Sequence, residues 1–250
     1  SIVKNKSDLR WQVYPKLAKW FYPWADQIIA VSNDVANDLT WTAKIPRKLI
    51  QVVYNPIVTA DLQAKSKEPL DHPWFKDGEL PVILSVGRLT DHKAFDILIQ
   101  AFYFVRKNHA VKLLILGEGE NRAALETLIW QLGLEQDVSL MGFVQNPYPY
   151  MAHASLFVLP SRWEGLPTVL VEALYLGAPI VATDCPGGSR EILRDGLFGR
   201  LIPMDAPLTL AEAIEWSMND RRSSPSKESW QPFNLDFVVD RYINLLIGDP

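Results

Sequence analysis

The sequence predicts a doubly wound α/β domain built around a parallel sheet, and two observations predict it. From residue 80 onward, short and mostly apolar runs alternate with stretches whose apolar residues recur every three or four positions. Runs without polar alternation are typical of strands buried on both faces, and the helical stretches between them form right-handed βαβ units. Such sheets bind ligands in the loops that follow the carboxyl ends of their strands. We therefore look for function in those loops.

The elements of this domain follow from the same pattern. The expected strands cover residues 81–86, 111–116, 138–141, 156–159 and 179–182. One expected helix carries apolar residues at helical spacing from Phe95 to Val105, and another carries them from Leu125 to Leu132. Each set forms a single apolar helix face, so both helices are expected to cover the sheet.

The chain divides into four predicted regions. Residues 1–58 form a separate unit, with strands over 26–31 and 49–54 and a helix over 33–41 whose N-cap is Ser32. Residues 59–80 read as a linker because they combine prolines and charges with little periodicity. Residues 81–218 form the main domain. Residues 219–250 begin as a polar loop rich in Ser and Pro and end in an amphipathic helix around Phe237, Val238 and Tyr242.

Composition bounds the function. The chain is 48% apolar, which is enough for a sizeable core, and its formal charge of -4 gives no global basic field for nucleic acid. The single cysteine, Cys185, cannot form an internal disulfide, and no apolar run is long enough to cross a membrane. We expect a cytoplasmic protein. Because the chain starts at Ser1 rather than Met, we also expect a piece of a longer protein.

The loop after the first strand of the main domain points to a phosphate ligand. It runs Gly87-Arg88-Leu89-Thr90-Asp91-His92-Lys93 and feeds a helix. A helix N-terminus offers free N–H groups and a positive dipole end. Arg88 can form a fork across two phosphate oxygens, while Lys93 supplies a mobile charge. The alternative is that both are ordinary solvated cations.

The loop over residues 160–168 carries the strongest signal. Pro167 suits a first helical turn, and Thr168 can help to satisfy the exposed amides there. Glu172 then falls inside the helix among apolar neighbours, where a ribose diol could donate to its carboxylate. Glu164, on the loop, can reach another part of the same ligand. A buried Glu172 satisfied by backbone or by an arginine is the alternative.

Three weaker signals refine this picture. The turn Gly117-Glu118-Gly119-Glu120-Asn121-Arg122 lacks the third glycine of a dinucleotide fingerprint and is acidic, which argues against a nicotinamide cofactor. Gly187 and Gly188 permit close approach by a sugar or phosphate. Cys185 reads as a pocket-wall residue, because no histidine lies near it in sequence.

Together these loops resemble the retaining glycosyltransferases of the family 4 type. The resemblance rests on SVGRLTDHKAFDILIQAF (85–102), LLILGEGENRAALE (113–126), IIAVSNDVANDL (28–39) and the segment from Val138 to Leu193, which contains PSRWEGLPTVLVEA. Its most specific element is the Glu-x7-Glu pair Glu164 and Glu172. The resemblance implies the GT-B fold of two facing Rossmann-like domains, of which this chain would hold the donor-binding domain and the end of the acceptor-binding one.

The resemblance also implies a role for each site residue. Arg88 and Lys93 would hold the donor diphosphate, Glu172 the ribose hydroxyls, and Glu164 the sugar end of the donor. Backbone groups of Gly87, Gly165, Leu166 and Thr168 would lie near the phosphates or sugar, and the base would contact the backbone around residues 142–146 and the loop near Gly117. The nucleotide sugar is a substrate, so no cofactor is expected. No Asp-x-Asp occurs in the chain, so no metal is expected either.

The implied enzyme moves a sugar from a nucleotide diphosphate sugar, with uridine favoured, to a saccharide or lipid-linked acceptor in polysaccharide or glycolipid biosynthesis. Retention can proceed through a covalent intermediate on Glu164 or by same-face attack with the departing phosphate as base, and we expect same-face attack. Most of the acceptor domain is missing, so we expect this chain to transfer sugar poorly or not at all. His92 and His153 are expected to be structural. The alternatives are a nucleotide-sugar-binding module and a GT-B-fold epimerase.

The opening of the chain is basic and aromatic. Its residues include Arg10, Trp11, Tyr14, Lys16, Lys19, Trp20, Phe21 and Trp24. We expect this segment to pack on the missing domain. The alternative is contact with an anionic membrane, at the inner face of the plasma membrane, where a lipid-linked acceptor would reside.

Overall fold

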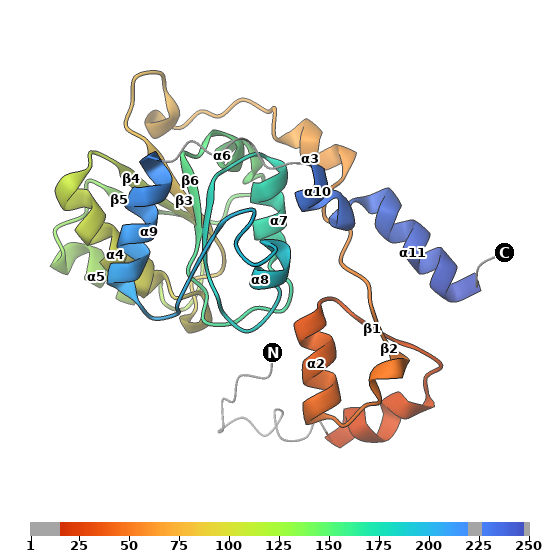
Figure 1. Ribbon diagram of the computed structural model, residues 1–250. Coiled ribbons are helices and arrows are strands. Elements are labelled where there is room, and N and C mark those ends of the chain that lie inside the picture. The colour runs from red at the N-terminus through yellow and green to blue at the C-terminus, as the bar shows by residue number, and fades with distance from the viewer. Residues whose placement is uncertain (1–15, 220–226, 248–250) are drawn as a thin grey trace.

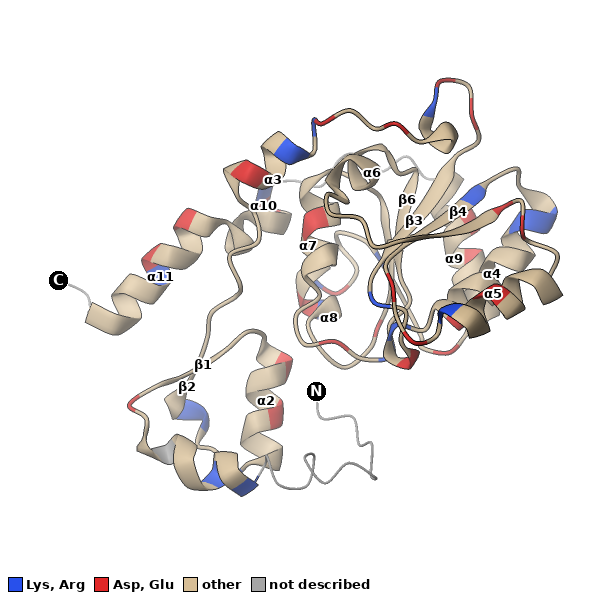
Figure 2. Cartoon of the chain, turned by 180° about the vertical axis from the view of Figure 1, so that it is seen from behind, with Lys and Arg blue, Asp and Glu red and all other residues tan. Residues whose placement is uncertain are grey.

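The computed structural model describes residues 16–219 and 227–247, which form a larger and a smaller unit joined by an extended segment (Figure 1). The predictions for Arg10, Trp11 and Tyr14 lie outside the described residues. Blue basic and red acidic segments are interspersed over both units (Figure 2). Within the described ranges, no helix is both long and apolar enough to span a bilayer.

The larger unit is built on a parallel sheet of six strands, which confirms the predicted fold class. The strands are β3 (Val82–Val86), β4 (Lys112–Leu116), β5 (Val138–Gly142), β6 (Leu156–Leu159), β7 (Ile180–Thr183) and β8 (Arg200–Ile202). Their order across the sheet is β5-β4-β3-β6-β7-β8, and all neighbours are parallel. The chain thus winds outward from β3 to β5 and then returns to place β6 beside β3.

Helices cover both faces of this sheet (Figure 1). On one face lie α4 (Phe95–Asn108), α5 (Arg122–Gln131) and α9 (Pro207–Asn219), and on the other lie α6 (Tyr148–His153), α7 (Thr168–Tyr175) and α8 (Ser189–Ile192). Each face has its own apolar cluster. Phe102 of α4 is fully buried in the first cluster, and Phe157 of β6 is fully buried in the second. The sheet is therefore held rigid between two packed layers.

The smaller unit contains a parallel pair of strands, β1 (Ile28–Ala30) and β2 (Ile50–Val52), with α2 (Asn33–Thr42), η1 (Tyr22–Trp24) and η2 (Arg47–Leu49). Ser32 caps α2 as predicted, since its hydroxyl accepts a hydrogen bond from the Val35 N–H. Both strands are shorter than the sequence predicts. Within the described residues, β1 and β2 pair only with each other, and three residues of each strand take part in that pairing.

The segment over residues 59–80 is not the structureless linker that its composition suggests. It contains α3 (Ala60–Lys65) and η3 (Pro73–Phe75). The Thr59 hydroxyl caps α3, and an ion pair between Asp61 and Lys65 spans one turn of it. A six-residue helix is too short for hydrophobic periodicity to reveal it.

The C-terminal segment packs where the chain crosses from the smaller to the larger unit. It contains α10 (Lys227–Trp230), η5 (Gln231–Phe233) and α11 (Leu235–Ile247). Phe233 is buried, its ring lies 4.7 Å from that of Tyr54, and the Val58 and Asn234 backbones form a parallel bridge. The predicted final helix is α11, whose Val238 is buried.

Candidate active site at the switch point of the sheet

The strand order places the site loops together. Because β3 and β6 are neighbours whose connections run in opposite directions across the sheet, the loops after them diverge and leave a crevice at their carboxyl ends. The loop after β3 carries Arg88 and Lys93, and the loop after β6 carries Glu164. The two loops also touch directly, since the Arg162 N–H donates to the His92 carbonyl at 2.7 Å.

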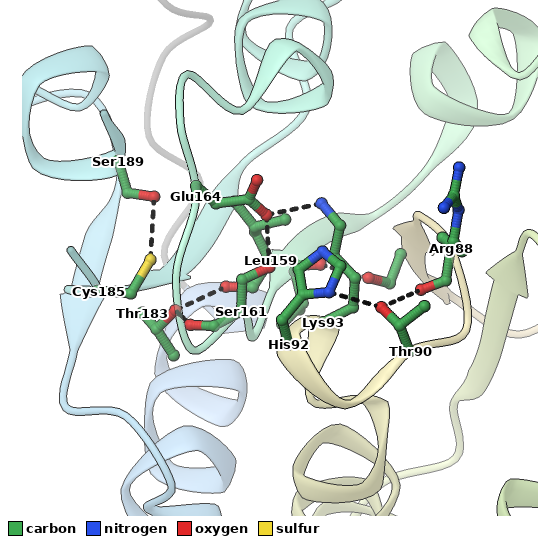
Figure 3. A network of polar contacts seen from close by, with 12 residues as sticks. Arg88, Thr90, His92, Lys93, Leu159, Ser161, Glu164, Thr183, Cys185 and Ser189 are labelled. Carbon is green, nitrogen blue, oxygen red and sulfur yellow. Dashed lines mark hydrogen bonds and ion pairs between the residues drawn. The ribbon is translucent and has the colours of Figure 1, made fainter. Parts of the chain in front are cut away.

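Lys93 and Glu164 form a largely buried ion pair at this point (Figure 3). The Lys93 Nζ lies 2.6 Å from Glu164 Oε1, and the Ser161 hydroxyl donates to the same oxygen at 2.7 Å. Lys93 ends η4 (Asp91–Lys93), the short turn that feeds α4. The charge of Lys93 is therefore compensated, but by a group that an incoming anion can compete with.

Arg88 is placed differently. Its guanidinium is exposed and makes no hydrogen bond or ion pair to any described residue. Figure 3 shows it directed away from the Lys93 and Glu164 pair. The two predicted cations thus flank the end of β3 without touching, one uncompensated and one held by a carboxylate. A diphosphate has charge enough for both.

A pocket of about 450 Å³ opens next to Arg88. It lies over the ends of β3, β4 and β5, and its lining is mainly apolar. Among its lining residues are Gly87, Arg88, Gly117, Glu118, Phe143, Val144 and Gln145. Both Glu118 oxygens accept from Arg122, which compensates its charge. The volume is in the range that small-molecule sites occupy.

Gly117 shapes this pocket. Its φ is +145°, and a Cβ there would lie 1.9 Å from the Gly87 carbonyl oxygen. The glycine that superficially suggests a dinucleotide turn therefore serves to bring the β3 and β4 loops into contact.

Glu172 lies one turn inside α7 and is partly buried. Its carboxylate has no hydrogen-bond or ion-pair partner in the described part of the chain, and burial raises its pKa to about 7. Among the described residues, neither a backbone group nor an arginine forms a hydrogen bond with Glu172, which was the alternative considered from the sequence. A carboxylate in this state gains from any ligand that brings hydroxyl donors.

The start of α7 offers backbone donors. Pro167 is the N-cap, one position earlier than the first turn predicted for it, and Thr168 is the first helical residue. The amides of Gly165, Leu166 and Thr168 make no hydrogen bond to the described residues. Free amides at a helix N-terminus are suited to an anion.

The Gly187-Gly188 turn packs closely against the Glu164 loop. A Cβ on Gly187 would lie 2.2 Å from the Glu164 carbonyl oxygen, and the Gly187 N–H donates to Asp34 at 2.9 Å. The Glu164 N–H in turn donates to the Pro186 carbonyl at 2.9 Å. This turn therefore supports the Glu164 loop, and the expected approach of a sugar or phosphate to Gly187 and Gly188 stays a prediction.

The histidines and the cysteine have structural surroundings. His92 is not simply solvated, because it stacks on Trp163 with ring centroids 4.5 Å apart and contacts the Thr90 hydroxyl at 2.7 Å. Burial, and then the Lys93 charge, lower its pKa. His153 contacts the Pro149 carbonyl inside α6. Cys185 is buried, and burial raises its pKa, so its thiol is poorly nucleophilic.

The contacts between the two units were not anticipated from the sequence. Glu191 accepts hydrogen bonds from the Asn33 N–H at 2.9 Å, from the Asn33 side-chain amide and from the Tyr54 hydroxyl. Burial, followed by the Glu191 hydrogen bond, raises the pKa of Tyr54. Glu191 therefore binds the N-terminus of α2 and joins the smaller unit to α8. No local motif signals this contact, since its partners are more than 130 residues apart.

Two family models match the chain. The model described as "Glycosyl transferases group 1" matches residues 66–231, and that described as "Glycosyltransferase Family 4" matches residues 1–61.

Named relatives agree with the first model. The chain is 35% identical over 220 residues to the Campylobacter jejuni N-acetylgalactosamine-N,N'-diacetylbacillosaminyl-diphospho-undecaprenol 4-alpha-N-acetylgalactosaminyltransferase, covering 88% of this chain and 58% of that protein. It is 30% identical over 246 residues to the lipopolysaccharide core biosynthesis glycosyltransferase LpsE of Rhizobium meliloti, covering 95% and 68%.

Solved structures have the same fold. The Anabaena HepE structure in complex with UDP-glucose superposes with a TM-score of 0.80 at 23% identity, covering all of this chain and 71% of that one. The apo galactosyltransferase WaaB of the lipopolysaccharide outer core gives a TM-score of 0.71, again at 23% identity, covering 90% and 63%. The architecture is that of GT-B glycosyltransferases. Since the first family model matches well over half of its residues, the chain belongs to the group 1 glycosyltransferases.

Proposed function

We propose that this chain is the donor-binding part of a retaining glycosyltransferase that uses a nucleotide diphosphate sugar, preferably a UDP-sugar. One arrangement supports the proposal: Lys93 pairs with Glu164 on the loop that leads into α7, the first amides of α7 are free, its Glu172 is partly buried without a partner in the described residues, and a pocket opens beside Arg88. Lys93 and the amides suit a diphosphate, Glu172 suits the hydroxyls of a ribose, and the pocket suits a flat base. The HepE structures that contain UDP and UDP-glucose support the preference for uridine.

The proposed donor extends across the crevice. The base lies in the pocket lined by Phe143 and Gln145, the ribose hydroxyls donate to Glu172, and the diphosphate lies between Arg88 and Lys93. The amides of Gly165, Leu166 and Thr168 face the phosphates or the sugar, and Glu164 faces the sugar end. No further cofactor is needed, because the two cations and the helix dipole supply the positive charge that a metal would otherwise bring.

The proposed reaction breaks the bond between the anomeric carbon and the oxygen of the β-phosphate. Both electrons of that bond leave with the diphosphate, so negative charge develops where Arg88 and Lys93 lie, and preplaced charge lowers that barrier. An acceptor hydroxyl forms its bond to the anomeric carbon on the same face and passes its proton to the departing phosphate oxygen. Configuration is then retained without a covalent intermediate on Glu164.

The acceptor is proposed to be a saccharide or a lipid-linked saccharide. The Campylobacter relative is named for a diphospho-undecaprenol acceptor, and LpsE is named for the lipopolysaccharide core. The chain spans only 58% and 68% of these two proteins, so a donor-binding module with little transfer activity of its own is the second candidate for this chain. Residues 1–58 would then be the end of the acceptor-binding domain, held to the donor domain through Glu191.

Exposed aromatic residues of the smaller unit fit that arrangement. Trp20, Phe21 and Trp24 are all exposed, and the last two rings pack edge to face at 5.5 Å. We propose that they pack on the remainder of the acceptor-binding domain, with contact to an anionic membrane as the alternative.

A thermal-shift panel tests the proposal. UDP, GDP and ADP are added in turn to the chain, and we expect UDP to raise the melting temperature most, because a ligand that binds only the folded state stabilises it. No shift with any of the three contradicts the donor site. A larger shift with GDP or ADP contradicts the uridine preference alone.

A further inference from the structure

The two oxygens of the Glu164 carboxylate are used unequally. Oε1 accepts from both Lys93, at 2.6 Å, and Ser161, at 2.7 Å. Oε2 accepts from no group in the described ranges. Figure 3 shows this second oxygen directed away from both donors. Since Glu164 is only 8% exposed, its carboxylate is fixed in a defined orientation by the two groups on Oε1.

The two donors differ in how firmly they are held. Ser161 is fully buried, and its carbonyl accepts a hydrogen bond from the Thr183 hydroxyl of β7. Thr183 is itself buried at 1% exposure. Ser161 therefore presents its hydroxyl from a rigid position between the ends of β6 and β7. Lys93 reaches Glu164 through a flexible four-carbon side chain and can turn to another anion.

From this difference we propose that Ser161 is a positioning residue, which holds Glu164 by Oε1 so that Oε2 stays directed at the donor sugar when Lys93 turns to the diphosphate. The inference rests on the proposed function. In the free protein Lys93 and Ser161 share the task. With a diphosphate bound, the Ser161 hydroxyl is the donor that remains, and a site holds its geometry only when such supporting bonds remain.

The test compares a nucleotide with its sugar conjugate. UDP and UDP-glucose are titrated calorimetrically into the chain and into Ser161→Ala, and the ratio of the two affinities isolates the sugar contacts. We expect Ser161→Ala to lower the preference for UDP-glucose over UDP about five- to tenfold, the size of a typical net hydrogen bond. The affinity for UDP alone should change by less than about twofold, because the nucleotide contacts are separate from this bond.

Two further variants separate positioning from folding. Ser85→Ala is the matched control, since Ser85 is also fully buried and its hydroxyl donates to a carbonyl, that of Val158, at 2.6 Å. It should lower the melting temperature without changing the affinity ratio. Ser161→Thr keeps the hydroxyl and should restore most of the ratio that Ser161→Ala loses.

The outcomes distinguish this inference from the proposed function. If the unmodified chain prefers UDP-glucose and Ser161→Ala keeps that preference, Ser161 does not position Glu164, whereas the donor site stands. If the unmodified chain binds both ligands equally, Glu164 makes no useful sugar contact and the inference is likewise overturned. If it binds neither ligand, while GDP or ADP binds, the same comparison is made with GDP and GDP-glucose or with ADP and ADP-glucose. Binding of none of these overturns both.

Discussion

Replacing Lys93 with alanine is expected to weaken UDP binding about 30- to 100-fold, which is the size of a charge-assisted contact to phosphate. In the free protein the Lys93 ammonium is paired with Glu164 at 2.6 Å, so UDP must compete for it. We expect UDP to win this competition, because its diphosphate is also held by Arg88 and by the amides at the start of α7. Calorimetric titration of UDP into the chain and into Lys93→Ala measures the effect.

The chain offers a matched control for this variant. Lys112 pairs with Asp137 at 2.8 Å, and its side-chain exposure of 19% is close to the 14% of Lys93. It begins β4, so it lies at the opposite end of the sheet from the site loops. Lys112→Ala should cost comparable stability yet leave UDP affinity unchanged. Equal UDP affinity in Lys93→Ala and Lys112→Ala would place the diphosphate elsewhere.

Glu172→Gln is expected to change how stability depends on pH. The pKa of Glu172 is about 7 in the folded chain and about 4.5 in the unfolded one, so between these values the folded state binds the extra proton. Folding is therefore favoured at pH 4.5 and loses this contribution as the pH rises through 7. The glutamine variant has no such titration. From pH 5 to pH 8 it should gain about 2 kcal/mol of unfolding free energy relative to the unmodified chain, measured by urea unfolding.

The same variant should bind nucleotide less well at pH 8. Its amide is uncharged and has an NH2 donor in place of the second acceptor oxygen, so the two ribose hydroxyls cannot each donate to a separate oxygen, and we expect a loss of about tenfold in UDP affinity. Glu215→Gln, on α9 at the other face of the sheet, should change neither property. A Glu172→Gln variant that is less stable at pH 8 than the unmodified chain would show that the carboxylate is not buried without a partner.

The fold was predictable because its signal is local. The run from Leu156 to Leu159 matches β6 residue for residue, since a strand buried on both faces needs a short apolar run. The sequence analysis missed β8, because Arg200–Ile202 is only three residues long and begins with a charge. Helix α3 escaped for the same reason: it is too short for periodicity. Elements that are short or stabilised mainly by neighbours leave no pattern to recognise.

The residues of the candidate site stand out in the sequence, but the contacts between them do not. Arg88, Lys93 and Glu164 stand out because they lie in loops that follow apolar strands, and Glu172 stands out because it lies among apolar neighbours in a helix. The pairing of Lys93 with Glu164 could not be predicted, because it joins residues 71 positions apart through the adjacency of β3 and β6. The contacts of Glu191 with α2 depend on how the two units meet, which no local pattern encodes.

A crystal structure of the chain with UDP tests the central claim most directly. The account predicts the diphosphate between the Arg88 guanidinium and the Lys93 ammonium and close to the amides of Gly165, Leu166 and Thr168. It also predicts the ribose hydroxyls on Glu172 and the base in the pocket beside Phe143. UDP bound with its phosphates away from Lys93, or with its ribose away from Glu172, would contradict the account.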